Sequence, residues 1–252
     1  MTKWRFLPGE PVERYTLPGE QLELYGPIGL RPIDDFTGSA PISQIRAYLE
    51  LSDGSGSWRA TDIKAVATPS GILTYPGLER RAEVVGKPPR RYRVKLETEL
   101  YRPLYLMIPV GPVLGPPYYR ETADGIEFDA FPYNDTYPPT DYTVNPPLKI
   151  KPQARDVTLA PAVNYPFLTH VRVLRGKVVE STGRPVVDAE VKRGNTERVL
   201  SGEQGAFALP LRWTPNGVAV AIDAIDHRTG RTGTINITLP QALGSSWTIT
   251  VS

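Results

Sequence analysis

Three residues near the carboxyl end have the types and spacing that could support catalysis. Asp223, Asp226 and His227 lie in the sequence DAIDHRTGR, and a carboxylate that orients an imidazole is a common arrangement for general base catalysis. However, Asp226 and His227 are adjacent, so on a strand their side chains would point to opposite faces. We interpret the group as a polar turn after the apolar run at 218–225, and a hydrolase centred on His227 remains an alternative.

The composition excludes most other catalytic and metal chemistry. The chain has 252 residues and no cysteine, which rules out disulfide bonds, thiolate nucleophiles and cysteine metal sites. The other histidine, His170, lies in YPFLTHVRV, where we expect a packing or surface role. The acidic run at 124–129 lacks the spacing of a calcium-binding EF-hand loop. We therefore predict a protein that is not an enzyme, with no cofactor and no metal site.

The charge balance gives no indication of a nucleic-acid partner. Twenty-nine basic and 27 acidic residues give a formal net charge of +2, far from the basic excess of nucleic-acid-binding domains. The strongest basic run is GKPPRRYR at 86–93. It could contact phosphate or an acidic partner, but we interpret it as a solvated loop that leads into a strand. The stretch DGSGS at 53–57 is interpreted as a hairpin tip, because the Lys-Ser/Thr and helix of a phosphate-binding loop do not follow it.

The hydropathy pattern indicates no membrane-spanning helix and no leader. No apolar run approaches the roughly 18 residues that a membrane helix needs. The opening sequence, MTKWRFLPGEPVERY, contains no apolar signal segment. We expect a protein made in the cytoplasm without a signal peptide, not inserted in a membrane, and finally located in a virion or another assembled particle.

Proline content and alternation predict an all-β fold. The chain has 27 prolines and 22 glycines, and proline at about twice its average usage of roughly 5% must lie in turns, edges and connectors. No segment has a sustained helical period. Apolar and polar residues alternate instead, as in sandwich strands, at 45–51, 92–100, 218–225 and 234–239.

Residues 106–167 differ from the rest of the chain because they are rich in proline and tyrosine. The proline pairs at 116–117, 138–139 and 146–147 favour polyproline II or extended turns. Apolar anchors such as Ile108 and Phe128 argue against disorder. We interpret this segment as an ordered, extended connector with a hairpin at DGIEFDAF.

The sequence on either side of this connector indicates an internal repeat. Three pairs of segments match in the same order: 30–42 with 174–186, 66–76 with 199–210, and 92–103 with 218–230. The first pair reads LRPIDDFTGSAPI and LRGKVVESTGRPV. Three ordered matches predict two copies of one sandwich module, the first of them degenerate.

The second copy also contains a motif of a known family. The sequences GKVVESTGRPVVDAEV and VLSGEQGAFALP, within 176–211, resemble the two hairpins of carboxypeptidase regulatory-like (transthyretin-like) β-sandwich domains. Gly183 supplies the turn and Pro185 restarts an extended chain, while Gly205 can take a positive φ before Phe207 enters the core. The resemblance implies a fold but almost no function. The chain ends WTITVS rather than in the Tyr-Arg-Gly-Ser of the family's hydroxyisourate hydrolases, so that enzyme branch is not supported.

These observations predict four parts of the chain. They are an N-terminal arm at 1–20, a first Ig-like or transthyretin-like module at 21–105, the Pro/Tyr-rich connector at 106–167 and a second module at 168–252. We expect a non-enzymatic structural protein of a large leaderless assembly, such as a phage tail, baseplate or contractile injection particle. The alternative is a carbohydrate- or cell-surface-binding sandwich module.

Aromatic residues beside prolines give the candidate contact surface, because rigid backbone and tyrosine favour interfaces. The predicted interface residues are Trp4, Phe6, Tyr118, Tyr119, Tyr133, Tyr137 and Tyr142. Their expected partners are other protein subunits of the assembly, with a surface glycan as the alternative. Deletion of residues 1–20 is expected to leave two folded modules and to abolish incorporation into the assembly.

Overall fold

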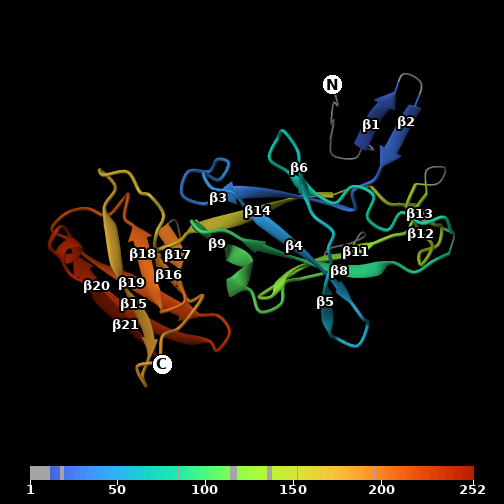
Figure 1. Ribbon diagram of the computed structural model, residues 1–252. Coiled ribbons are helices and arrows are strands. Elements are labelled where there is room, and N and C mark those ends of the chain that lie inside the picture. The colour runs from blue at the N-terminus through green and yellow to red at the C-terminus, as the bar shows by residue number, and fades with distance from the viewer. Residues whose placement is uncertain are drawn as a thin grey trace. The chain divides into compact units, whose positions relative to one another are not determined.

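The structure is a computed structural model that describes residues 12–17, 20–83, 86–113, 118–134, 138–151, 153–195 and 197–252. Its regular elements are almost entirely β-strands, which confirms the predicted all-β fold (Figure 1). Two short 3-10 helices are present among the described residues, η1 (Leu104–Met107) and η2 (Gln241–Gly244). Neither of them, nor any other described segment, has the length and apolar character of a membrane-crossing helix.

The chain forms two compact units, and each is built from several segments. Unit 1 contains the described residues up to Pro32 together with Ile45–Glu97 and Val110–Val157. Unit 2 contains Ile33–Gln44, Thr98–Pro109 and Thr158–Ser252. Neither unit is therefore a single continuous stretch of sequence.

A five-stranded antiparallel sheet forms much of unit 1. Its order is β10-β11-β8-β4-β5, with bounds β4 (Arg46–Ser52), β5 (Trp58–Ala60), β8 (Arg90–Glu97), β10 (Tyr119–Thr122) and β11 (Gly125–Ala130). Alternation in the central strand β8 places Tyr92, Val94 and Leu96 on a buried face. The expected hairpin at DGIEFDAF is β10–β11.

A second sheet has the order β6-β7-β3-β14-β9. Its strands are β3 (Ile28–Asp34), β6 (Val66–Ala67), β7 (Leu73–Thr74), β9 (Tyr101–Pro103) and β14 (Gln153–Pro161). Arg31 on β3 bonds Asp156 on β14 at 2.7 Å, and the amide of Asp35, the residue after β3, donates to the carbonyl of Leu159 further along β14 at 3.0 Å. Because both contacts advance in the same direction, β3 and β14 run parallel. Two small hairpins complete the strands of unit 1, β1 (Val12–Leu17) with β2 (Glu20–Leu24) and β12 (Thr140–Asp141) with β13 (Leu148–Lys149).

The C-terminal part of unit 2 is a sandwich of a three-stranded sheet, β18-β15-β21, and a four-stranded sheet, β17-β16-β19-β20. The bounds are β15 (Val173–Glu180), β16 (Glu190–Arg193), β17 (Glu197–Leu200), β18 (Ala206–Pro210), β19 (Ala219–Asp226), β20 (Arg231–Thr238) and β21 (Trp247–Val251). Inward-facing side chains of both sheets form one apolar core, including Leu174, Val191, Phe207, Ile222 and Ile249.

Two glycines have the roles that the sequence predicted. Gly183 and Gly205 have φ angles of +84° and +69°, a region that L side chains rarely adopt. A Cβ on Gly205 would also lie 2.3 Å from the carbonyl oxygen of Val178. Phe207 follows and is buried in the core, so this turn admits only glycine where the chain enters β18.

The two sets of sheets have the same strand order, which supports the predicted repeat. The order β7-β3-β14 corresponds to β18-β15-β21, and β5-β4-β8-β11 corresponds to β17-β16-β19-β20. The three matched sequence pairs place β3 opposite β15, β7 opposite β18 and β8 opposite β19. Both β7–β3 and β18–β15 are antiparallel.

The prediction that residues 106–167 form an extended connector is wrong. Its described part supplies β10, β11 and β14 to the two sheets, because residues such as Ile126, Phe128 and Val157 are buried within strands. The predicted limits of the modules change for the same reason. The first repeat needs strands beyond residue 105, and unit 2 includes segments well before residue 168.

Candidate interaction surface

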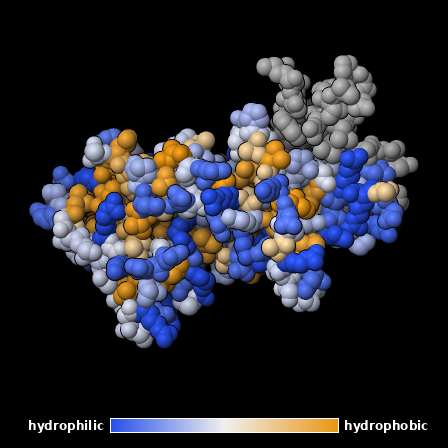
Figure 2. All heavy atoms as spheres, in the orientation of Figure 1, coloured by the Kyte–Doolittle hydropathy of each residue, from blue (hydrophilic) through white to orange (hydrophobic). Residues whose placement is uncertain are grey.

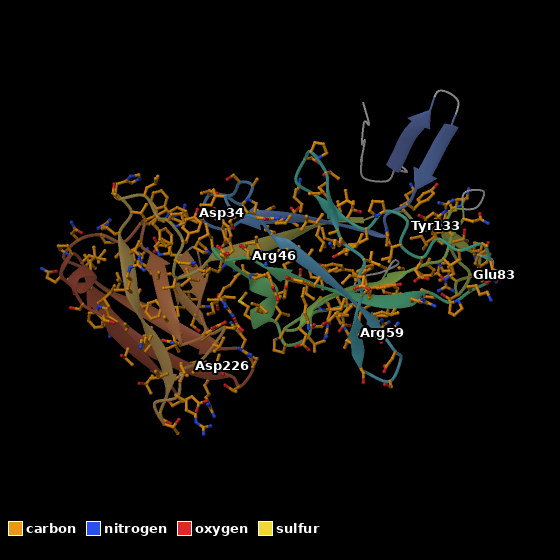
Figure 3. All side chains as sticks on the ribbon, in the orientation of Figure 1. Asp34, Arg46, Arg59, Glu83, Tyr133 and Asp226 are labelled. Atoms are coloured by element: carbon orange, nitrogen blue, oxygen red, sulfur yellow. The ribbon has the colours of Figure 1, made fainter. Side chains whose placement is uncertain are left out.

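The three catalytic candidates have separate structural partners. Asp226 ends β19 and accepts hydrogen bonds from the Thr229 hydroxyl at 2.7 Å and the Arg228 amide at 3.1 Å, which closes the turn to β20 (Figure 3). Asp223 accepts a hydrogen bond from Thr234 across the β19–β20 pair at 2.7 Å. The polar-turn interpretation therefore fits the geometry at Asp226.

His227 contacts a different carboxylate from the one that its sequence position suggests. Its Nε2 lies 3.0 Å from Glu190 Oε2, and Lys192 Nζ lies 3.2 Å from the same oxygen. Among the described residues, no group of three or more His, Cys, Asp or Glu side chains could hold a metal ion.

The basic run at 86–93 is largely neutralised by carboxylates within unit 1. Arg91 bonds Asp129 at 2.9 Å, and Arg93 bonds Glu50 at 2.8 Å through Nε. Lys95 bonds the other oxygen of Glu50 at 2.8 Å. Burial favours a raised pKa at Glu50, but the hydrogen bonds from Lys95 and Arg93 outweigh it and lower the pKa. These cations therefore pair with carboxylates of the neighbouring strands β4 and β11.

Two of the predicted interface tyrosines are corrected by the structure. Tyr119 and Tyr133 are only 6% and 1% exposed, so their rings cannot meet a partner. The Tyr133 hydroxyl lies 3.2 Å from both the amide and the carbonyl oxygen of Tyr25 (Figure 3). The Tyr119 hydroxyl donates to Glu121 at 2.8 Å. Both side chains are part of the packing of unit 1. The proline-rich sequence around them leads into folded strands instead of an exposed surface.

The remaining predicted residues divide into exposed and undescribed ones. Tyr118 and Tyr142 are 37% and 46% exposed. Trp4, Phe6 and Tyr137 lie outside the described residues. Tyr118 borders a shallow hollow that also includes the exposed Val113 and the buried Phe128, with ion pairs of Arg91 and Arg120 around it.

The most exposed large aromatic residue among those described is one that the sequence interpretation missed. Figure 2 shows apolar and hydrophilic residues interspersed over the visible face. Trp213, which follows β18, is 71% exposed. A tryptophan in the turn sequence RWTPNG was the available signal, because turn sequences rarely enter a core.

A buried carboxylate holds the backbone at Trp213. Glu197 on β17 is almost fully buried, and its Oε1 accepts a hydrogen bond from the Trp213 amide at 2.9 Å. Its Oε2 bonds Arg193 at 3.1 Å. The next residue, Thr214, is buried. The loop is therefore fixed on both sides of an exposed indole.

Arg212, the residue before Trp213, fixes the same loop through contacts with Phe36. Its guanidinium lies 4.3 Å from the centre of the Phe36 ring and donates to the Phe36 carbonyl at 2.6 Å. Phe36 packs edge-on against Phe167 and Tyr165. The buried Asp34 (Figure 3) accepts a hydrogen bond from the Tyr165 hydroxyl at 2.8 Å, and burial together with this carboxylate raises the pKa of Tyr165.

A second segment lies beside the Trp213 loop. The Leu211 amide donates to the Arg172 carbonyl at 2.8 Å, and the Arg172 side chain donates to Asn216 at 2.7 Å. These two segments carry the exposed side chains of Leu168 and Val218. We call Leu168, Arg172, Arg212, Trp213 and Val218 the Trp213 surface.

The charge of the Trp213 surface differs from that of the sheets. Among the described residues, the hydrogen bonds of Arg172 and Arg212 go to neutral oxygens, those of Asn216 and Phe36, and no ion pair is formed by either guanidinium. Arg198, by contrast, pairs with Asp35 at 3.1 Å. The surface therefore combines apolar groups with uncompensated positive charge.

Comparisons with known proteins give little further information. No family model matches the chain, and neither does any curated protein. Among solved structures, a mutant of the shaft pilin spaA from Lactobacillus rhamnosus GG is similar at 8% identity and a TM-score of 0.25, covering 89% of this chain and 96% of that chain. A likeness at this TM-score carries no argument about fold or function.

Proposed function

We propose that this protein is a non-enzymatic structural subunit that binds other protein subunits of a large assembly, such as a phage tail, baseplate or contractile injection particle. The observation that carries the proposal is the 71% exposure of Trp213 on a loop fixed by Glu197 and Arg212. The repeated sandwich topology supports a structural role, and the kind of assembly is taken from the sequence pattern.

A fixed, exposed tryptophan is well suited to a protein interface. Tryptophan and arginine are the residues most enriched among those that dominate binding energy. Because the loop is already braced by two side chains, little additional ordering is needed on association, and more of the contact energy remains as affinity. Leu168 and Val218 add exposed apolar side chains on the two segments that the Leu211–Arg172 and Arg172–Asn216 hydrogen bonds join.

The uncompensated arginines define the partner further. Arg172 and Arg212 lie on the two segments that carry the apolar side chains. A partner with carboxylates around an apolar residue would complement this surface, and such complementarity sets specificity and association rate. The proposed partner surface is therefore acidic with an apolar centre.

A glycan is the second candidate ligand, because an exposed indole face can stack on a sugar ring. The amide of Asn216 lies on the same loop, although it accepts a hydrogen bond from Arg172. This alternative predicts binding to a purified oligosaccharide in the absence of any protein partner.

Sedimentation of native particles tests the proposal. Trp213→Ala is compared with wild type and with Ile63→Ala, which truncates an exposed apolar residue of unit 1. We expect wild type and Ile63→Ala to cosediment with the assembled particle and Trp213→Ala to remain as free monomer by light scattering. Arg172→Glu should weaken cosedimentation in the same direction.

Two results would contradict the proposal. Cosedimentation of Trp213→Ala at the wild-type level would show that the Trp213 surface is not the interface. A wild-type monomer that joins no particle but binds a glycan array through Trp213 would replace the structural proposal with the glycan-binding one.

A further inference from the structure

We propose that the C-terminal sandwich of unit 2 acts as a mechanical clamp that resists tension applied between residues 172 and 252. This inference goes beyond subunit binding and rests on a different observation. Strands β15 and β21 are the first and last of the sandwich, and they lie side by side and parallel. We call them the terminal pair. In the first repeat, β3 and β14 have the same relation.

The direction of the terminal pair decides how a pulling force is distributed. Tension pulls the start of β15 and the end of β21 away from each other. In a parallel pair this force acts along the strands, and it loads all of their evenly spaced hydrogen bonds together. An antiparallel hairpin pulled at its open end separates one hydrogen bond after another. The parallel arrangement therefore requires a much larger force for the same kind of bond.

The register and burial of the terminal pair strengthen this effect. Pairing extends from Gly176 with Trp247 to Glu180 with Val251. Ile249 and Val251 are fully buried on the core side, so water cannot easily replace a stretched hydrogen bond. A Cβ on Gly176 would lie 2.3 Å from the Trp247 carbonyl oxygen, which shows how closely the two backbones approach.

The last strand is also fastened on its other side. The backbone groups of Ser252 and Thr232 are joined in both directions, at 3.2 and 3.4 Å. The Trp247 indole donates to the Ala242 carbonyl at 2.9 Å. A Cβ on Gly233 would lie 2.1 Å from the Thr250 carbonyl oxygen. Because β20 contacts β21 this closely, β21 cannot peel away without breaking a second set of contacts.

Single-molecule pulling in two directions tests the clamp. The chain has no cysteine, so pairs of introduced cysteines give unique attachment points on the full-length protein. His170→Cys with Ser252→Cys loads the terminal pair in shear, and all three of His170, Thr169 and Ser252 are exposed. Val218→Cys with Thr238→Cys opens the β19–β20 hairpin, in which Ala219 pairs with Thr238. We expect a several-fold higher rupture force for the first pair.

Both cysteine pairs must leave the free energy of unfolding in urea unchanged, so that only the direction of force differs. If His170→Cys impairs folding, Thr169→Cys replaces it. Equal rupture forces in the two directions, or a higher force for the β19–β20 pair, would overturn the proposal. Loss of particle binding in Trp213→Ala does not affect this measurement, so the two proposals fail separately.

Discussion

Glu197 and Trp213 are 16 residues apart in the chain, and the buried carboxylate of one accepts the backbone amide of the other at 2.9 Å. A nearly inaccessible carboxylate therefore holds the backbone of the most exposed tryptophan among the described residues. The bond joins β17 in the core of the sandwich to the loop that we propose as an interface.

Replacing Glu197 with alanine should loosen the Trp213 loop. The change removes the acceptor of the Trp213 amide and leaves Arg193 without its carboxylate, so we expect a loss of about 2–4 kcal/mol in the free energy of unfolding. Hydrogen exchange at the Trp213 amide should accelerate strongly. Glu203→Ala is the control, because Glu203 is exposed. Unchanged exchange at Trp213 in Glu197→Ala would disprove this role.

Two buried tyrosines should respond in opposite directions to loss of the hydroxyl. The Tyr75 hydroxyl has no hydrogen-bond partner among the described residues, so Tyr75→Phe should raise the free energy of unfolding by about 1 kcal/mol. The Tyr92 hydroxyl donates to Glu79, so Tyr92→Phe should lower it by about 1–2 kcal/mol. Urea unfolding of both variants measures the difference. The same sign for both changes would contradict the assigned contacts.

The Glu50 cluster predicts an acid-dependent loss of stability. Lys95 and Arg93 together lower the pKa of Glu50 below its ordinary value of 4.5, although burial opposes them. A carboxyl group with a lowered pKa in the folded state stabilises the fold above its ordinary pKa. This contribution is lost as the pH falls through the lowered value. Unfolding free energies should therefore fall below pH 4.5 in wild type.

Glu50→Gln should show a smaller dependence in the same pH range, with lower stability at neutral pH. The control is Glu97→Gln, an exposed residue on the same sheet, which should keep the wild-type pH profile. A Glu50→Gln profile parallel to that of wild type would show that the cluster does not contribute.

The sequence predicted most of what depends on local pattern. Alternation located β4, β8, β19 and β20 to within a few residues, and the glycine turns at Gly183 and Gly205 followed from their neighbours. The repeat order was visible because three short motifs survived in both halves. These features are determined by residues close together in the chain.

The sequence could not predict features that depend on distant partners. Residues 106–167 were interpreted as a connector because prolines dominate their pattern, whereas pairing of β11 with β8 determines their structure. Tyr119 and Tyr133 have the composition of an interface, but strands from elsewhere cover them. For Trp213 the only signal in the sequence was its place in a turn. The position of its loop depends on Glu197 and, through Arg212, on Phe36, which lies far away in the chain.

The interleaving of the two units has a consequence for synthesis on the ribosome. Phe36 precedes its partner Arg212 by 176 residues, and Asp35 precedes Arg198 by 163. At typical translation rates the wait for Arg212 lasts roughly 10–35 s. During this interval the nascent segment 33–44 has none of its final contacts with the C-terminal sandwich. A pause or a chaperone in this window should therefore affect the yield of unit 2 more than that of unit 1, whose last segment is complete at Val157.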